Sequence, residues 1–184
     1  MSFFLTADLH LDFHRTFSQV HPDGTTSRLC DISNAVLQGL GKSDAPMAIF
    51  LGDILNRSRN VDPLLANFTR NLFVKILDSG KRVIVLRGNH DCRQSFGKIH
   101  CLLKPLLPDK VEYISQSTSL SFGGGVVGHF LPYYPNPTVL KTAIEEFKLN
   151  YDYINIFFSH FSVEKAMIKD DFSMGLRWQS ITLS

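Results

Sequence analysis

The sequence has 184 residues, of which 44% are hydrophobic and 20% charged, a balance that excludes an intrinsically disordered chain and suits one domain. The formal net charge of +2 is too small to indicate a nucleic-acid partner from bulk charge alone. The apolar runs are shorter than the roughly 18 residues of a membrane span, and the three cysteines form no CxxC pair. We therefore expect a single domain over residues 1–184, without a membrane partner, in a reducing, cytoplasmic setting.

Strands and helices alternate through the first half of the chain. Apolar runs predict buried strands at 3–7, 47–51 and 83–86. Apolar residues at helical spacing predict a helix at 26–40 and another that begins at Asp62-Pro63 and ends before Gly80. Strands that are apolar on both faces, with helices between them, indicate a parallel sheet covered by helices.

The second half of the chain has a different pattern. Short strands at 111–114, 119–122 and 126–127, with three glycines before the last of them, indicate an antiparallel meander. A helix is predicted from Asn136-Pro137 to about Leu149, and a buried strand at 154–158. From residue 162 onward the sequence is only weakly periodic.

Side chains that can bind a metal follow four of the predicted strands. These residues are Asp8 and His10, Asp53, Asn89 with His90 and Asp91, and His160. Because the carboxyl ends of strands in an open α/β sheet line one crevice, we expect the four clusters to converge. Carboxylate, imidazole and amide ligands without a thiolate suit Mn²⁺, Fe or Zn²⁺. A pair of such ions about 3.5–4 Å apart is a common device for hydrolysing phosphate esters.

The motifs that contain these residues are TADLHLD, IFLGDILNR, VIVLRGNHDC and IFFSHFSV, in that order. Together they resemble the calcineurin-like metallophosphoesterase superfamily, and within it they are most similar to the Mre11/SbcD nucleases. The resemblance spans residues 3–163. It implies an α/β fold in which helices flank a two-sheet sandwich, and it implies hydrolysis with two divalent cations, Mn²⁺ in the first place.

The resemblance also implies a role for each residue of the motifs. Asp8, His10 and Asp53 are similar to the ligands of the first metal, and Asp53, Asn89 and His160 to those of the second. His90 resembles the catalytic histidine, which Asp91 is expected to hold in place. Asn56 and Arg57 are expected to affect substrate selectivity.

The sequence departs from the family at its last motif, GHxH. The 24 residues after His160 contain no histidine, and Gly128-His129 is followed by Phe130-Leu131 rather than by xH. We therefore expect the fold to be incomplete at its C-terminus, before the last metal-binding motif.

Three functions remain open at this point. The first is an SbcD/Mre11-like DNA nuclease subunit of recombination or repair, acting as an exonuclease or an endonuclease. Its implied partners are DNA, an SbcC/Rad50-like ATPase subunit and a second copy of the chain. The second is a phosphatase or small-molecule phosphodiesterase of the same superfamily. The third is a catalytically impaired relative that binds nucleic acid or a partner protein.

Overall fold

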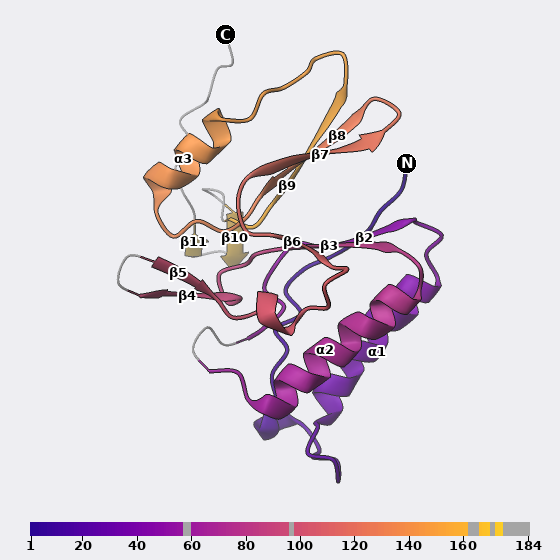
Figure 1. Ribbon diagram of the computed structural model, residues 1–184. Helices are drawn as coiled ribbons and strands as arrows, with labels where there is room; N and C mark the ends of the chain where they lie inside the picture. The colour runs from indigo at the N-terminus through magenta and orange to yellow at the C-terminus, as the bar shows by residue number, and fades with distance from the viewer. Residues whose placement is uncertain (57–59, 96–97, 162–165, 170–171, 175–184) are drawn as a thin grey trace.

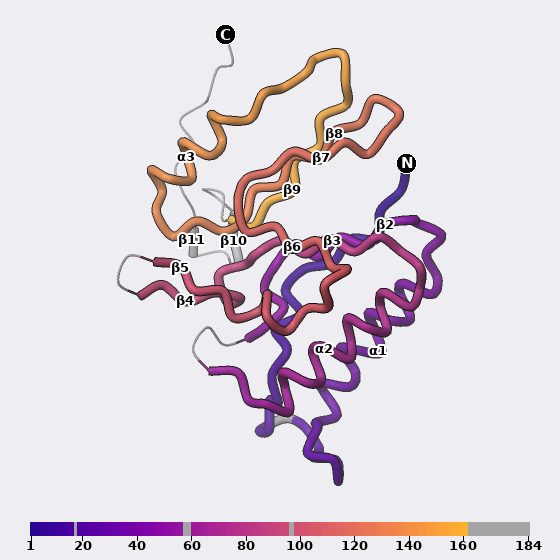
Figure 2. Tube along the Cα trace, viewed as in Figure 1, coloured from indigo at the N-terminus to yellow at the C-terminus, as the bar shows by residue number. Residues whose placement is uncertain are grey.

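The computed structural model describes residues 1–56, 60–95, 98–161, 166–169 and 172–174. Two sheets pack face to face, and helices α1 (Ser27–Gly41) and α2 (Pro63–Asp78) cover the other face of the first sheet (Figure 1). The tube along the chain in Figure 2 shows the same three layers: the helix pair, the first sheet and the second sheet. The expected α/β fold, with two sheets flanked by helices, is confirmed.

The first sheet contains the strands of the first half of the chain. It has the order β1 (Phe4–Thr6), β2 (Met47–Phe50), β3 (Arg82–Leu86) and β6 (Glu112–Ile114), and all neighbours are parallel. In β2, Ala48 and Phe50 pack in the cluster under the helices, whereas Met47 and Ile49 pack in the cluster between the sheets. Both faces of this strand are therefore buried, which explains its unbroken apolar sequence.

The second sheet has the order β7 (Thr118–Gly123), β8 (Val126–Leu131) and β9 (Ile154–Ser159). β7 and β8 are antiparallel, and β9 runs parallel to β8 after helix α3 (Pro137–Glu145). Phe130 and Phe158 stack with ring centroids 4.8 Å apart and join the cluster between the sheets. The carboxyl end of β9 therefore lies against the first sheet.

The predicted meander is wrong in one respect. The segment at 112–114 pairs with β3 in the first sheet, so the antiparallel part is limited to β7 and β8. Helix α3 ends at Glu145, before the expected Leu149, and the Phe147 ring beyond it lies 5.2 Å from the His129 ring. Among the residues that the structure describes, two antiparallel strand pairs were not predicted. They are β4 (Cys92–Ser95) with β5 (Lys98–Cys101), and β10 (Ala166–Lys169) with β11 (Phe172–Met174).

Single turns of 3₁₀ helix occur at Arg15–Phe17 and Lys104–Leu106. Helix α2 begins as predicted, with Asp62 accepting a hydrogen bond from the Leu64 backbone N–H at 2.8 Å and Pro63 in the first turn. None of the helices in the part of the chain described by the structure is long and apolar enough to cross a bilayer.

Candidate metal centre

The carboxyl ends of β1, β2, β3 and β9 meet where the two sheets join. Backbone hydrogen bonds continue the pairing of β1 and β2 beyond the strands. The Asp8 N–H donates to the Gly52 carbonyl at 3.1 Å, and the His10 N–H donates to the Asp53 carbonyl at 3.0 Å. These bonds place Asp8 and His10 beside Asp53, although more than 40 residues of chain separate the two motifs.

The backbone at this junction has left-handed conformations that residues other than glycine seldom adopt. The φ angles are 55° at Asp8, 45° at His10 and 52° at Asp53. Such conformations cost on the order of 1–3 kcal/mol each and persist where the surrounding structure enforces them. Three of them at one strand edge aim the side chains of both loops at a common point.

Two glycines permit the strands to converge. A Cβ on Gly88 would collide with the backbone N and the Oδ1 of Asp53. A Cβ on Gly52, whose φ is 99°, would lie 2.8 Å from both the Gly88 Cα and the Nδ1 of His160. Any other residue at these two positions would push β2, β3 and His160 apart.

Asp53 lies at the middle of the junction and is only 3% exposed. Its Oδ1 accepts the His90 backbone N–H at 2.9 Å and lies 3.4 Å from the Nε2 of His160. Its Oδ2 lies 3.8 Å from the Nε2 of His10 and 3.9 Å from that of His90. Burial favours a higher pKa for Asp53, but the hydrogen bonds from His160 and His90 outweigh burial and lower the pKa. Asp53 is therefore an ionised carboxylate with imidazoles on both of its oxygens.

The described residues contain two groups of side chains that could each hold a cation. One group is His10, Asp53 and His90, and the other is Asp8, Asp53 and His160; within each, the ligand atoms lie within 4.8 Å of one another. Asn89 adjoins the second group, because its Oδ1 lies 2.9 Å from the Nε2 of His160. Asp53 is common to both groups.

A family model described as calcineurin-like phosphoesterase matches residues 1–173. The chain belongs to the calcineurin-like phosphoesterase family. It is thus a metal-dependent phosphoesterase, of a family that typically binds two divalent metals. No protein with a curated description matches the chain significantly.

The histidines of this phosphoesterase are oriented as metal ligands are. The Nδ1 of His160 lies 2.7 Å from the Leu51 carbonyl oxygen, and the Nδ1 of His90 lies 2.6 Å from that of Asn56. Because a carbonyl oxygen only accepts, each Nδ1 carries a proton, and each Nε2 faces Asp53, where it would bind a cation through its lone pair in place of a proton. The Nε2–carboxylate distances of 3.4–3.9 Å also suit ligands that are each about 2.0–2.2 Å from one ion. The residues therefore fit the pair of cations that the family binds.

The grouping differs from the assignment implied by the resemblance in two ligands. Asp8 is grouped with Asp53 and His160, although its Oδ1 also lies 3.6 Å from the Nε2 of His10. His90, expected to act on the substrate, is grouped with His10 and Asp53. Its side chain is 37% exposed, so its Nε2 is also accessible to a substrate.

The pKa of His160 connects cation binding to pH. Burial favours a lower pKa for this imidazole, but the hydrogen bond with Asp53 outweighs burial and raises the pKa. A proton and a cation thus compete for the same Nε2 in this phosphoesterase. We expect cation affinity to fall as the pH decreases through the titration of His160.

Asp91 does not orient His90 in the way that the sequence suggested. Its fully buried carboxylate accepts backbone N–H groups of Ile54 at 2.9 Å, Leu55 at 3.1 Å and Gly88 at 2.9 Å. The Asn56 carbonyl holds the His90 ring instead. Asp91 thus joins the loops after β2 and β3, and its connection to His90 is through the backbone.

Asn56 is one of the two residues expected to affect substrate selectivity. Its side chain donates to Asp12 Oδ2 at 3.0 Å and connects its loop to the loop after β1, while its carbonyl orients the His90 ring. Arg57 lies outside the described residues.

Two main-chain carbonyls, those of Leu51 and Asn56, fix the histidine rings and were not predicted from the sequence. The direction of a carbonyl group cannot be predicted from a pattern of side chains.

His129 lies within the second sheet and not among the side chains around Asp53. It is 1% exposed; its Nδ1 lies 2.8 Å from the Ser119 hydroxyl and its Nε2 lies 2.8 Å from the Asn155 Oδ1. Both ring nitrogens therefore have partners within the second sheet, and His129 is not grouped with the residues around Asp53.

Proposed function

We propose that this phosphoesterase is a DNA nuclease of the Mre11/SbcD type, which hydrolyses phosphodiester bonds with two Mn²⁺ ions. The observation that carries the proposal of two-ion hydrolysis is the position of Asp53 between two ligand groups. The preference for DNA over other phosphate esters rests on the four sequence motifs, which are most similar to those of these nucleases.

The bound cations would neutralise charge on the phosphate oxygens and favour attack by water. The chain's own residues hold and orient the reacting groups. Asp53 presents Oδ2 toward His10 and Oδ1 toward His160. We assign Asp8 and His10 to one ion with Asp53, because Asp8 lies 3.6 Å from His10, and Asn89 and His160 to the other, which leaves His90 free for the reaction. The backbone bond from His90 keeps the Asp53 carboxylate from rotating.

His90 is the residue that we propose moves a proton. With Nδ1–H fixed on the Asn56 carbonyl, its Nε2 faces the centre and, when protonated, can donate that proton to the leaving oxygen. The short bond to Asn56 orients the ring for this step.

The proposed assembly follows from the same resemblance. We propose that the nuclease works with an SbcC/Rad50-like ATPase subunit and as a homodimer, in recombination or repair of DNA in the cytoplasm. Sedimentation of the purified chain, alone and with such an ATPase, tests both associations directly.

The activity is tested with two substrates under the same conditions. With Mn²⁺, linear DNA should be hydrolysed in preference to 4-nitrophenyl phosphate, a generic aryl phosphomonoester. The Asp53→Asn variant, which keeps the shape of the side chain and removes its charge, should hydrolyse neither. The reverse preference of the wild-type chain would favour a phosphatase, and hydrolysis by the variant would refute the two-ion site.

A further inference from the structure

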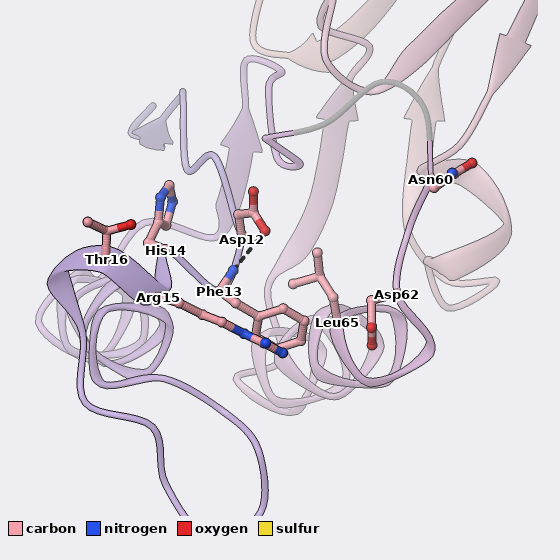
Figure 3. Close-up of a pocket in the computed structure, with 8 residues that line it drawn as sticks. All are labelled: Asp12, Phe13, His14, Arg15, Thr16, Asn60, Asp62 and Leu65. Carbon is pink, nitrogen blue, oxygen red and sulfur yellow. Dashed lines mark hydrogen bonds between the residues drawn. The ribbon is translucent and has the colours of Figure 1, made fainter.

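A cavity of about 550 Å³ lies beside the metal centre, between the loop after β1 and the start of α2 (Figure 3). Its wall adjoins the proposed catalytic residue, because Asp12 accepts a hydrogen bond from Asn56, whose carbonyl binds His90. The volume is within the range of about 300–1,000 Å³ that is usual for small-ligand sites. A substrate group next to the scissile phosphate could therefore enter it.

Arg15 is the cation of this cavity. Its guanidinium carbon lies 5.9 Å from the centroid of the Phe13 ring, and Figure 3 shows the two side chains together on the loop side of the cavity. Phe13 is only 9% exposed, so the ring is a fixed support. Among the residues that the structure describes, Arg15 has no hydrogen bond or ion pair. Arg15 is exposed, so its guanidinium can bind a ligand that enters the cavity.

The charges around the cavity favour an uncharged group over a phosphate. Asp12 and Asp62 also line it, and each already accepts a backbone N–H at 2.8 Å, Asp12 from Phe13 and Asp62 from Leu64. A phosphate bound to Arg15 would lie near the Asp62 carboxylate. A nucleobase avoids this repulsion, can stack on the guanidinium plane and can direct its amino groups to carboxylate or amide oxygens.

We infer that this cavity binds the nucleobase of the nucleotide next to the scissile phosphodiester, stacked on the Arg15 guanidinium. Leu65, 5% exposed, supplies apolar surface, and Asn60 lies on the α2 side with Asp62 (Figure 3). The inference rests on the proposed function, because it assigns the cavity to a nucleotide substrate of the same site. Arg15 is a binding residue for the base and takes no part in proton transfer.

Two phosphodiesters that differ in one group test the inference. The 4-nitrophenyl ester of thymidine 5′-phosphate has a base, and methyl 4-nitrophenyl phosphate has a methyl group in place of the nucleoside. Because stacking a base contributes about 1–3 kcal/mol, Arg15→Ala should lower kcat/KM for the thymidine ester by about 5- to 150-fold, mainly through KM. Hydrolysis of the methyl ester should be unchanged. Arg70→Ala, which removes an exposed arginine from α2, is the matched control and should change neither rate.

Arg15→Lys separates stacking from charge. Lysine keeps the positive charge and loses the planar guanidinium, so this variant should resemble Arg15→Ala on the thymidine ester. A lysine variant with wild-type KM would show that Arg15 binds a phosphate, and equal losses on both esters would place Arg15 in the catalytic centre. Either result would overturn the inference.

Binding of adenosine, followed by NMR in EDTA, keeps this test separate from the proposed function. Adenosine has no phosphate, and the measurement requires neither metal nor turnover. Binding by the wild type that Arg15→Ala abolishes would support the base site even if neither ester were hydrolysed, in which case the proposed function alone would fail. Hydrolysis of both esters with no adenosine binding and no effect of Arg15→Ala would refute the base site alone.

Discussion

The Nδ1 of His160 lies 2.7 Å from the carbonyl oxygen of Leu51, a hydrogen bond between residues 109 positions apart in the chain. His160 follows the last strand of the second sheet, and Leu51 follows β2 of the first. The bond therefore joins the two sheets at the metal centre and leaves the Nε2 of His160 facing Asp53 at 3.4 Å.

Two substitutions of His160 separate its structural and ligand roles. His160→Asn retains an amide N–H near the position of Nδ1 and loses Nε2. It should unfold in EDTA at nearly the wild-type temperature but lose the part of the rise in Tm that comes from the ion bound by His160. His160→Ala should lose the same part of the Mn²⁺ effect and also about 1–3 kcal/mol of stability, because the Leu51 carbonyl loses its donor. Thermal unfolding with and without Mn²⁺ measures both; a normal Mn²⁺ response in His160→Asn would exclude His160 as a ligand.

Gly88→Ala should damage the centre through packing alone. The added Cβ would overlap the backbone N and Oδ1 of Asp53, and overpacking of this kind costs about 1–3 kcal/mol. We expect a lower free energy of unfolding in urea and weaker Mn²⁺ binding. Gly41→Ala, at the end of α1, has no atom within 4 Å of the new Cβ and is the control. Equal effects of the two substitutions would contradict the role given to Gly88.

Much of the first sheet was predictable from the sequence, and the reason is local. β2 is buried on both faces, and α2 has its cap at Asp62. Both elements can therefore be predicted from the few residues that form them. The partner of the segment at 112–114 depends on hydrogen bonds to β3, about 28 residues earlier, which no short window of sequence reports. The β4–β5 pair was missed because β4, with the sequence CRQS, has three polar residues in succession and β5 is only four residues long.

The candidate site was predictable to a similar extent. Residue types at strand ends indicated Asp8, His10, Asp53, Asn89 and His160, and the structure brings these side chains together. The arrangement within the site was not predictable. The partners of the His90 ring and of the Asp91 carboxylate are main-chain groups, which every residue has and which the residue types in the sequence therefore do not identify.

His90→Ala tests the proposed proton transfer. Turnover should fall by about 10²- to 10⁴-fold, the usual contribution of general acid–base catalysis, while the chain still binds two Mn²⁺ ions. Single-turnover rates and calorimetric titration measure the two properties separately. Loss of one Mn²⁺ ion in this variant would show that His90 is a ligand together with His10 and Asp53, which its place in that group also allows.

Asp91 should make the stability of the metal-free protein depend on pH. Burial raises the pKa of Asp91 to about 6 against the hydrogen bonds from Leu55 and Gly88, whereas an unfolded chain has its ordinary value near 3.8. Between these values the folded state binds the proton more tightly. The stabilising contribution is therefore complete below about pH 4 and is lost as the pH rises through 6.

Urea unfolding in EDTA, compared with Asp91→Asn, measures this dependence. The stability of the wild type relative to the variant should fall by about 2–3 kcal/mol between pH 4 and pH 7. A relative stability that rises over this interval would mean that the three N–H groups keep Asp91 ionised.

Asp53 belongs to both cation groups, and calorimetric titration of Mn²⁺ into the wild type and Asp53→Asn tests this shared role. The wild type should bind two ions. Because the variant removes the shared charge, the affinity for both ions should fall by at least about tenfold, which corresponds to about 1.4 kcal/mol at each site. If Asp53→Asn retains one ion at wild-type affinity, the carboxylate serves a single group and the two-ion centre described for this chain is incorrect.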